Sequence, residues 1–445
     1  MLVHFRTIII LCLLQLPYTL HSKSLTMMEE RIIGESLYNQ TPRTEPSLLP
    51  IENFFLYELN RICYEGDIVL DYPLTVRIID SPQINAFATA GSFIFIYTGI
   101  LKVLPDVSEI MGVLCHELTH TQEHHIRRMF EHHSDLNNQK MILLAALPLI
   151  ILFPGGGEML YGMAVDQTYL QQQLFSQQME FEADAGAIKL LSKSGYDASK
   201  LESAFETIGR YESLDNLPQY FSYYLTHPLT RDRISRIRSQ QEAIGFSMIS
   251  VFRPQFDYTL LESELHSIYD TTYYSFEQQL VINQYRDAKS AQQVSELLEI
   301  YPQSITIRMK LWNALRFEKQ WDKLKEYDLK YASDAFWNKL PLVIEARAEA
   351  DFHTLSTRDF IRKYQNTLLD SYACDNVLKY LAQAYQQEKI VNYYHVAQAR
   401  YFLKQGDYKQ ALKELKSNDV DTTNFYTEAV LKEAEMKSKI LKTML

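Results

Sequence analysis

The chain has 445 residues, of which 47% are hydrophobic and 22% are charged, a balance that is normal for folded globular domains. Its length exceeds what one ordinary hydrophobic core accommodates, so two or three domains are expected. The formal net charge is −11 at pH 7, and no stripe of Lys and Arg runs through the sequence, which argues against nucleic-acid binding.

Residues 1–24 have the pattern of a secretory signal peptide. Arg6 precedes an apolar stretch from Ile8 to Leu16, and small polar residues follow it. The apolar stretch is too short to span a bilayer as a helix. Cys12 is not preceded by the small residue that a lipoprotein site requires. We therefore expect a secreted protein without a lipid anchor.

Two helices and a small sheet are expected after this segment. The helices are predicted over Glu29–Tyr38 and Ile51–Cys63. From Leu74 onward the sequence is rich in β-branched and aromatic residues, which indicates short strands. Gly and Ser interrupt this pattern at Thr89–Ser92, where we predict a hairpin.

Residues 116–120 read His-Glu-Leu-Thr-His, within a stretch that favours a helix. Two histidines four residues apart lie on one helical face, so the rings of His116 and His120 can reach a single zinc ion. Glu117 faces the same pocket and can take a proton from a metal-bound water. The alternative is an ordinary helical turn that contains two chance histidines.

This helix is expected to begin at Asp106, with Glu109 completing a capping box, and to run to about Glu131. Further histidines follow the motif, at positions His124, His125, His132 and His133. The first of them would lie about 12 Å along the axis from His116, too far to share its metal. We interpret these four as solvated residues or as support for the ligands.

A catalytic zinc site takes three protein ligands and leaves one position open for water. The helix predicted over Asp166–Lys193 places Glu180 and Asp184 on one face, while Glu182 points elsewhere. We assign Glu180 as the third ligand and Asp184 as the carboxylate that accepts the other ring N–H of a ligating histidine. A solvated acidic face is less favoured, because the residues around Glu180 are mostly uncharged.

Residues 141–157 form an apolar stretch that Pro148 interrupts, so it cannot span a bilayer as a helix. Two interpretations stay open for this region. One is a buried hairpin or a lid over the cleft, which we favour. The other is a surface segment, over residues 141–163, that makes peripheral contact with a membrane or a membrane protein.

Taken together, these motifs resemble the zinc endopeptidases that include HtpX and the CaaX prenyl proteases. The second motif of that family appears here as Glu180-Phe181-Glu182-Ala183-Asp184. Residues 78–101 and the Thr-His-Pro motif within 226–234 are similar to one branch, the periplasmic BepA-like proteases. The resemblance covers roughly residues 26–250. One departure is the Thr89–Ser92 turn, where the family more often has a Pro-Gly-Gly-type sequence.

The resemblance implies roles for residues that the sequence alone would leave unassigned. His227, otherwise an ordinary loop histidine before Pro228, would enter the active site. There it would stabilise the oxyanion with help from Arg233, or occupy the open zinc position in a resting state. One Zn²⁺ per chain is implied.

A strand borders the cleft in zinc proteases of this kind. We expect an extended substrate to pair with this strand by β-augmentation, at Asn85, Ala86, Phe87 and Ala88. The alternative is that these residues only build the sheet and the core.

Beyond a boundary near residues 245–275 the chain is almost entirely helix-forming. Residues 396–415 follow a tetratricopeptide-type repeat, residues 311–327 are a weaker copy, and residues 290–304 fit the second helix of another unit. The predicted fold is therefore mostly α. A zincin-like α+β metallopeptidase domain with a small sheet (25–255) follows the signal peptide and precedes an all-α repeat domain (256–445).

The leading hypothesis is a zinc metalloendopeptidase. The resemblance adds the periplasm of a Gram-negative bacterium, a role in outer-membrane protein assembly and quality control, and contact of the repeats with misassembled substrates or the barrel-assembly machinery. A second hypothesis is a periplasmic chaperone or assembly adaptor whose protease site is latched or auxiliary. A membrane-embedded HtpX-like protease is disfavoured, because no further stretch of sufficient apolar length exists.

Overall fold

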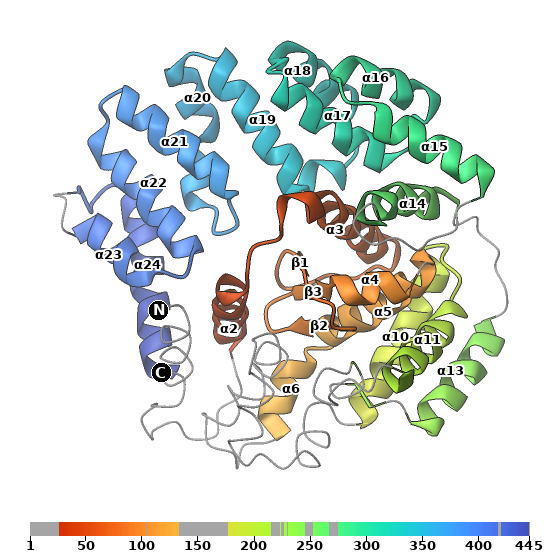
Figure 1. The fold of residues 1–445 in the computed structure, drawn as a ribbon. Helices are drawn as coiled ribbons and strands as arrows, with labels where there is room; N and C mark the ends of the chain where they lie inside the picture. Colours follow the sequence, from red (N-terminus) through yellow and green to blue (C-terminus); the bar gives the residue numbers. More distant parts are fainter. Residues whose placement is uncertain are drawn as a thin grey trace. The chain divides into compact units, whose positions relative to one another are not determined.

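The computed structural model describes residues 26–104, 106–132, 177–214, 223, 227–228, 230–244, 252–266, 275–416 and 420–444. The predicted signal peptide and the apolar segment at 141–163 lie outside these residues. The chain divides into two compact units, Met1–Gln255 with Met444–Leu445, and Phe256–Thr443. The described part is mostly helical with one small sheet (Figure 1), which confirms the predicted fold class.

The first unit opens with the two predicted helices, α2 (Met27–Gln40) and α3 (Leu49–Glu65). Thr26 caps α2, since its side chain accepts a hydrogen bond from the backbone N–H of Glu29 and the Glu29 side chain accepts one from Thr26 in return. A short 3₁₀ helix, Pro46–Leu48, precedes α3. Apolar side chains of α3 are buried along most of its length, so this helix forms part of the core.

The sheet has three strands in the order β1-β3-β2. Strand β3 (Phe93–Tyr97) lies in the middle, parallel to β1 (Thr75–Ile79) and antiparallel to β2 (Ala86–Thr89). The predicted hairpin joins β2 to β3, with positive φ at Gly91 and Ser92 that lets the chain reverse. Strand β2 is thus an edge strand of the described sheet.

Helices α4 (Thr98–Val103), α5 (Val107–Gln122) and α6 (His125–His132) follow the sheet. Two predictions about α5 were wrong. Asp106 does cap the helix, by accepting from the Ser108 N–H at 2.8 Å, but Glu109 accepts from the Ser203 hydroxyl instead of completing a capping box. The helix also ends at Gln122 rather than near residue 131, because the backbone turns left-handed at His124 (φ 51°).

Helices α10 (Gln177–Lys193), α11 (Lys200–Leu214) and α13 (Arg231–Ile244) complete the described first unit. Helix α10 packs along α5, while α11 packs against α5 and α13 packs against α10. The approach of α10 to α5 is close at Gly186, where a Cβ would lie 2.4 Å from Cγ2 of Thr119. This glycine therefore lets α10 carry its carboxylates up to the histidines of α5.

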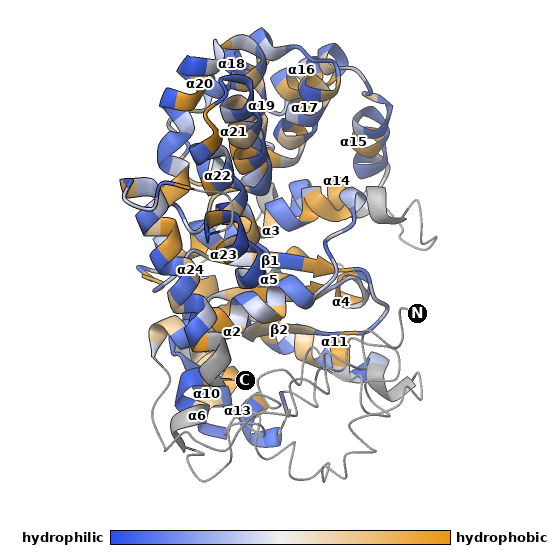
Figure 2. Cartoon of the chain, turned by 90° about the vertical axis from the view of Figure 1, so that its left-hand side faces the viewer, coloured by the Kyte–Doolittle hydropathy of each residue, from blue (hydrophilic) through white to orange (hydrophobic). Residues whose placement is uncertain are grey.

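The second unit is a succession of helices with short connections. Its helices and short 3₁₀ turns are α14 (Phe252–His266), α15 (Phe276–Asp287), α16 (Ala291–Ile300), α17 (Ile305–Phe317), α18 (Trp321–Lys330), Trp337–Lys339, α19 (Pro341–Thr354), α20 (Thr357–Tyr364), Gln365–Leu369, α21 (Asp375–Gln387), α22 (Val391–Lys404), α23 (Tyr408–Lys416) and α24 (Phe425–Met444). Figure 2 shows hydrophobic and hydrophilic residues alternating along them, as expected of helices that bury one face.

Three helix pairs of this unit share one kind of turn. The connections α17–α18, α21–α22 and α22–α23 each contain a left-handed residue, Lys319 (φ 55°), Lys389 (φ 57°) and Gly406 (φ 73°). A recurrent turn of this type gives successive helix pairs similar geometry, which suits a repeat architecture. The assignment to tetratricopeptide repeats stays a prediction. Within the described residues, no helix combines the length and apolar character that crossing a membrane requires.

Candidate active site

Four buried side chains converge where α5 meets α10. They are His116, His120, Glu180 and His227, whose candidate ligand atoms all lie within 4.8 Å of one another. Nε2 of His116 is 3.0 Å from Nε2 of His120, and both nitrogens lie 3.5 Å from the Glu180 carboxylate. Nδ1 of His227 lies 3.1 Å from Oε1 of Glu180. The structure thus brings together the three predicted ligands and the histidine of the Thr-His-Pro motif.

Asp184 lies one helical turn beyond Glu180, on the side of His116 away from the cluster. Its Oδ1 is 3.0 Å from Nδ1 of His116, in an ion-pair contact rather than a well-aligned hydrogen bond. The contact favours the tautomer of His116 that carries its proton on Nδ1, which leaves Nε2 for the cluster. Asp184 therefore lies beside the outer nitrogen of His116, and its role as the acceptor of that ring N–H stays a prediction.

Burial and charge act in opposite directions on the pKa values in this cluster. Burial lowers the pKa of His116, but the carboxylates that contact it raise the value to about 9. Burial and the neighbouring His116 hold the pKa of His120 well below its usual range. Burial raises the pKa of Glu180, yet His227 and the buried guanidinium of Arg233 hold this pKa well below its usual range. In the absence of a metal ion, the cluster at neutral pH therefore contains an ionised Glu180, a protonated His116 and a neutral His120.

The donor atoms fit a metal ion. The two Nε2 atoms face each other, while Nδ1 of His116 is directed to Asp184 and Nδ1 of His120 lies 2.8 Å from His125. Two nitrogen lone pairs at 3.0 Å repel each other unless a proton or a metal cation lies between them. Two imidazoles and a carboxylate, with His227 beside them as a candidate fourth ligand, match the donor set of a zinc site.

Glu117 is fully buried beside this cluster, and groups from three parts of the chain contact its carboxylate. The Ala88 N–H of strand β2 donates to Oε2 at 2.8 Å. The Tyr223 hydroxyl donates to Oε1 at 3.2 Å, and Nε2 of His227 lies 3.4 Å from the same oxygen. The carboxylate is therefore held in one orientation, next to the candidate ligands.

Arg233 of α13 is buried behind the ligands. Its Nε and Nη2 donate to both oxygens of Asp184, at 2.8 and 2.7 Å, and its Nη1 donates to the Pro228 carbonyl at 3.0 Å. Nη1 also lies 2.7 Å from Oε2 of Glu180. These contacts occupy the guanidinium of Arg233. The geometry therefore supports a role in which Arg233 positions the carboxylates of Asp184 and Glu180 more than the role of oxyanion donor that the resemblance implied.

The residues predicted to bind substrate lie on and before β2. Asn85, Ala86, Phe87 and Ala88 are all at most 5% exposed. The ring of Phe87 stacks on Phe95 with 4.8 Å between centroids, so this side chain belongs to the sheet core. The Ala88 N–H, in contrast, points away from β3 and toward α5. Pairing of a substrate with this edge stays a prediction, and it would involve the backbone rather than these side chains.

Sequence reasoning missed two parts of the site. Tyr223 lies four residues before His227, and the His227 N–H donates to its carbonyl at 3.0 Å, a helical spacing that could have indicated a shared side. His125 and its partner Glu182, which lie 3.1 Å apart, left no such signal, because α5 was expected to continue through residue 125.

Part of this chain is similar in sequence to known proteins. Residues 60–241 match the family model described as Peptidase family M48. A provisionally named beta-barrel assembly-enhancing protease of Vibrio cholerae is 26% identical over 254 residues, which are 56% of this chain and 51% of that protein. The beta-barrel assembly-enhancing protease of Yersinia pestis is 25% identical over 222 residues, 49% of this chain and 45% of the relative.

A eukaryotic relative is also similar. The mitochondrial metalloendopeptidase OMA1 of Danio rerio is 25% identical over 168 residues, 37% of this chain and 35% of its own length. This chain therefore spans about half the length, or less, of the curated relatives described. The matched family consists of metallopeptidases, so it implies a metal ion, and the buried cluster offers candidate ligands for one.

Proposed function

We propose that this chain, which carries a peptidase M48 domain over residues 60–241, is a zinc-dependent endopeptidase with one Zn²⁺ per chain. The observation that carries the proposal is the convergence of His116, His120 and Glu180 beside the buried carboxylate of Glu117. His-Glu-x-x-His on one helix and a carboxylate from a second helix are the ligands and the base that this chemistry requires.

When bound, zinc would lower the pKa of a water molecule and polarise the scissile carbonyl. Glu117 accepts the proton of the attacking water and passes it to the leaving amine. The Ala88 N–H and the Tyr223 hydroxyl orient this carboxylate, at 2.8 and 3.2 Å. His227, close to both the base and the ligands, is placed either to stabilise the oxyanion or to occupy the open position at rest.

Removal of the metal is expected to abolish peptide cleavage and to lower the thermal stability of the first unit. Three or four buried ligands bind the ion only in the folded state, so binding stabilises that state. The test combines metal analysis of the purified protein with cleavage of an unfolded protein substrate before chelation, after it, and after zinc is returned. Cleavage that survives complete chelation would remove the basis of the proposal.

Replacement of Tyr223 by Phe should lower kcat by about 10- to 100-fold with little change in KM, because Glu117 loses a hydrogen bond that holds it in place. Steady-state peptide cleavage measures this. Tyr196→Phe is the matched control, since the Tyr196 hydroxyl is also buried and donates to a carboxylate, Glu58, at 2.8 Å. If the two variants lowered kcat equally, Tyr223 would have no particular role at Glu117.

For the substrate, we propose polypeptides and, more specifically, misassembled outer-membrane proteins in the envelope of a Gram-negative bacterium. The support is the printed name of the bacterial relatives, which associates them with beta-barrel assembly. An extended substrate would pair with the edge of β2, where the Ala88 N–H meets Glu117. Contact with the barrel-assembly machinery would fall to the helical unit at 256–443.

A second function is favoured by one observation, the tight packing of His227 against Glu117 and Glu180, at 3.4 and 3.1 Å. If this histidine latches the site, the helical unit could act as a chaperone or adaptor while hydrolysis is suppressed. A Glu117→Gln chain separates the two functions in a strain that lacks the protein. Full complementation supports the adaptor, and failed complementation supports the enzyme.

A further inference from the structure

We propose that His125 is a positioning residue for the metal ligand His120, whose proton it fixes on Nδ1 so that Nε2 is free to bind the metal. The inference rests on the metal site of the proposed function but does not depend on which peptide is cleaved. It concerns a histidine that lies five residues after His120, outside the His-Glu-x-x-His motif.

The backbone turn after α5 places His125 next to the ligand. In a continuous helix, a residue five positions after His120 would lie about 140° around the axis, on another face. The left-handed conformation at His124 ends this register, and α6 starts directly at His125. Nδ1 of His125 then lies 2.8 Å from Nδ1 of His120, with 4.8 Å between the ring centroids.

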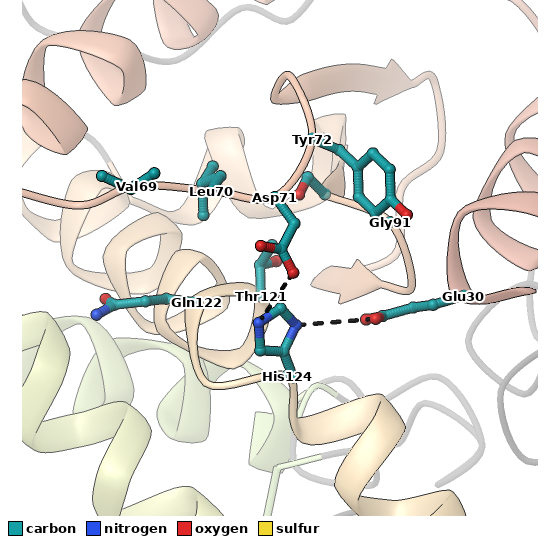
Figure 3. A pocket seen from close by; sticks show the side chains of 10 residues that line it. Glu30, Val69, Leu70, Asp71, Tyr72, Gly91, Thr121, Gln122 and His124 are labelled. Atoms are coloured by element: carbon teal, nitrogen blue, oxygen red, sulfur yellow. Dashed lines mark ion pairs between the residues drawn. The ribbon is translucent and has the colours of Figure 1, made fainter. Parts of the chain in front are cut away.

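Side chains from two other segments hold the turn. Nε2 of His124 lies 3.3 Å from Asp71, and its Nδ1 lies 3.8 Å from Glu30 of α2. Figure 3 shows the His124 ring between these two carboxylates, among the residues that line a small pocket. The His124 ring thus has a carboxylate on each side. The next side chain, His125, is fully buried and contacts His120 instead.

The hydrogen-bonding partners fix the protons of this chain of rings. His125 is fully buried, and its Nε2 lies 3.1 Å from Oε2 of Glu182. A carboxylate only accepts, so Nε2 of His125 carries a proton. A neutral imidazole has a single N–H, so Nδ1 of His125, which lies 2.8 Å from Nδ1 of His120, is the acceptor. The proton between the two rings therefore belongs to Nδ1 of His120.

Glu182 is itself fixed from outside. Nη1 of Arg128 donates to Oε2 of Glu182 at 2.6 Å. The two ligating histidines are thus supported differently, since Asp184 contacts His116 directly at 3.0 Å whereas Glu182 acts on His120 through a second imidazole. Partners of this kind set the tautomer and orientation of the ligand, and their loss weakens metal binding without removing a ligand.

The experiment measures zinc affinity of the full chain by competition with a chromophoric chelator, together with thermal unfolding of the metal-free protein. His125→Phe keeps a ring but no acceptor, and should bind zinc about 10- to 100-fold more weakly. His125→Asn places an amide oxygen where Nδ1 was, so it should recover a large part of the affinity. His395→Phe is the matched control, because Nδ1 of His395 also lies 2.8 Å from a partner, the Glu414 carboxylate, but this histidine belongs to the second unit.

Each outcome decides the inference. Weaker zinc binding by His125→Phe, partial recovery by His125→Asn and binding within about twofold of the unchanged chain for His395→Phe would support it. Unchanged affinity of His125→Phe would overturn it. Equal losses of zinc affinity in the Phe and Asn variants, together with a lower unfolding temperature of both metal-free variants, would also overturn it. Such a result would show that His125 has a purely structural role. If the unchanged chain bound zinc at the expected affinity without cleaving any peptide, the proposed function would fail while this inference stood.

Discussion

Glu117→Gln is expected to lower peptide hydrolysis by about 10²- to 10⁴-fold while the protein keeps its zinc. Gln has nearly the same shape as Glu, and its amide oxygen still accepts the Ala88 N–H that lies 2.8 Å from the native carboxylate. An amide cannot take up the proton of the attacking water, so the base is lost while the ligands stay in place. The measurements are kcat/KM on a peptide substrate and zinc content per chain.

Glu109→Gln is the matched control for this variant. Glu109 belongs to the same helix and is also buried, but it accepts a hydrogen bond from the Ser203 hydroxyl and lies two turns before the motif. Its replacement should leave kcat/KM within a few-fold of the unchanged protein, with zinc retained. Residual cleavage by Glu117→Gln at the level of this control would mean that another group acts as the base.

The sequence was sufficient to group candidate site residues where their arrangement depends on regular helix geometry. Residues four apart on a helix share a face whatever the tertiary structure, so His116 with His120, and Glu180 with Asp184, could be grouped before any coordinates. That both pairs meet in one place depends on how α5 and α10 pack, which the spacing alone does not determine. The need of a catalytic zinc site for a third protein ligand suggested that step, the family resemblance supported it, and the structure places the two pairs in contact.

The sequence was insufficient to predict contacts where an irregular backbone determines which side chains meet. A helix drawn through residue 131 turns His125 away from His120, and only the left-handed residue His124 reverses this. Non-glycine residues seldom adopt that conformation, so no local pattern predicted it. The contacts of Arg233 were not predicted from the sequence for a related reason. A buried guanidinium bonds whichever carboxylates lie nearest, and these come from a different helix, α10.

Arg233→Met is expected to destabilise the metal-free first unit by about 3–5 kcal/mol, because it leaves the carboxylates of Glu180 and Asp184 buried without their cation. Methionine preserves most of the apolar volume, so the loss reports charge rather than a cavity. Calorimetric unfolding of the full chain measures it. All tryptophans, Trp312, Trp321 and Trp337, lie in the second unit, so their fluorescence shows independently that this unit is unchanged.

Arg236→Met is the control for Arg233→Met, because it removes an exposed arginine from the same helix, α13. Its side chain is 57% exposed and its ion pair with Asp232 is 3.3 Å long, so removing it should change stability by less than about 1 kcal/mol. Added zinc should restore part of the stability that Arg233→Met loses, because a divalent cation would then balance Glu180. If instead Arg233→Met unfolded like the unchanged chain, kept its zinc and lost only kcat, the guanidinium would act on the transition state and its contacts with the carboxylates would be incidental.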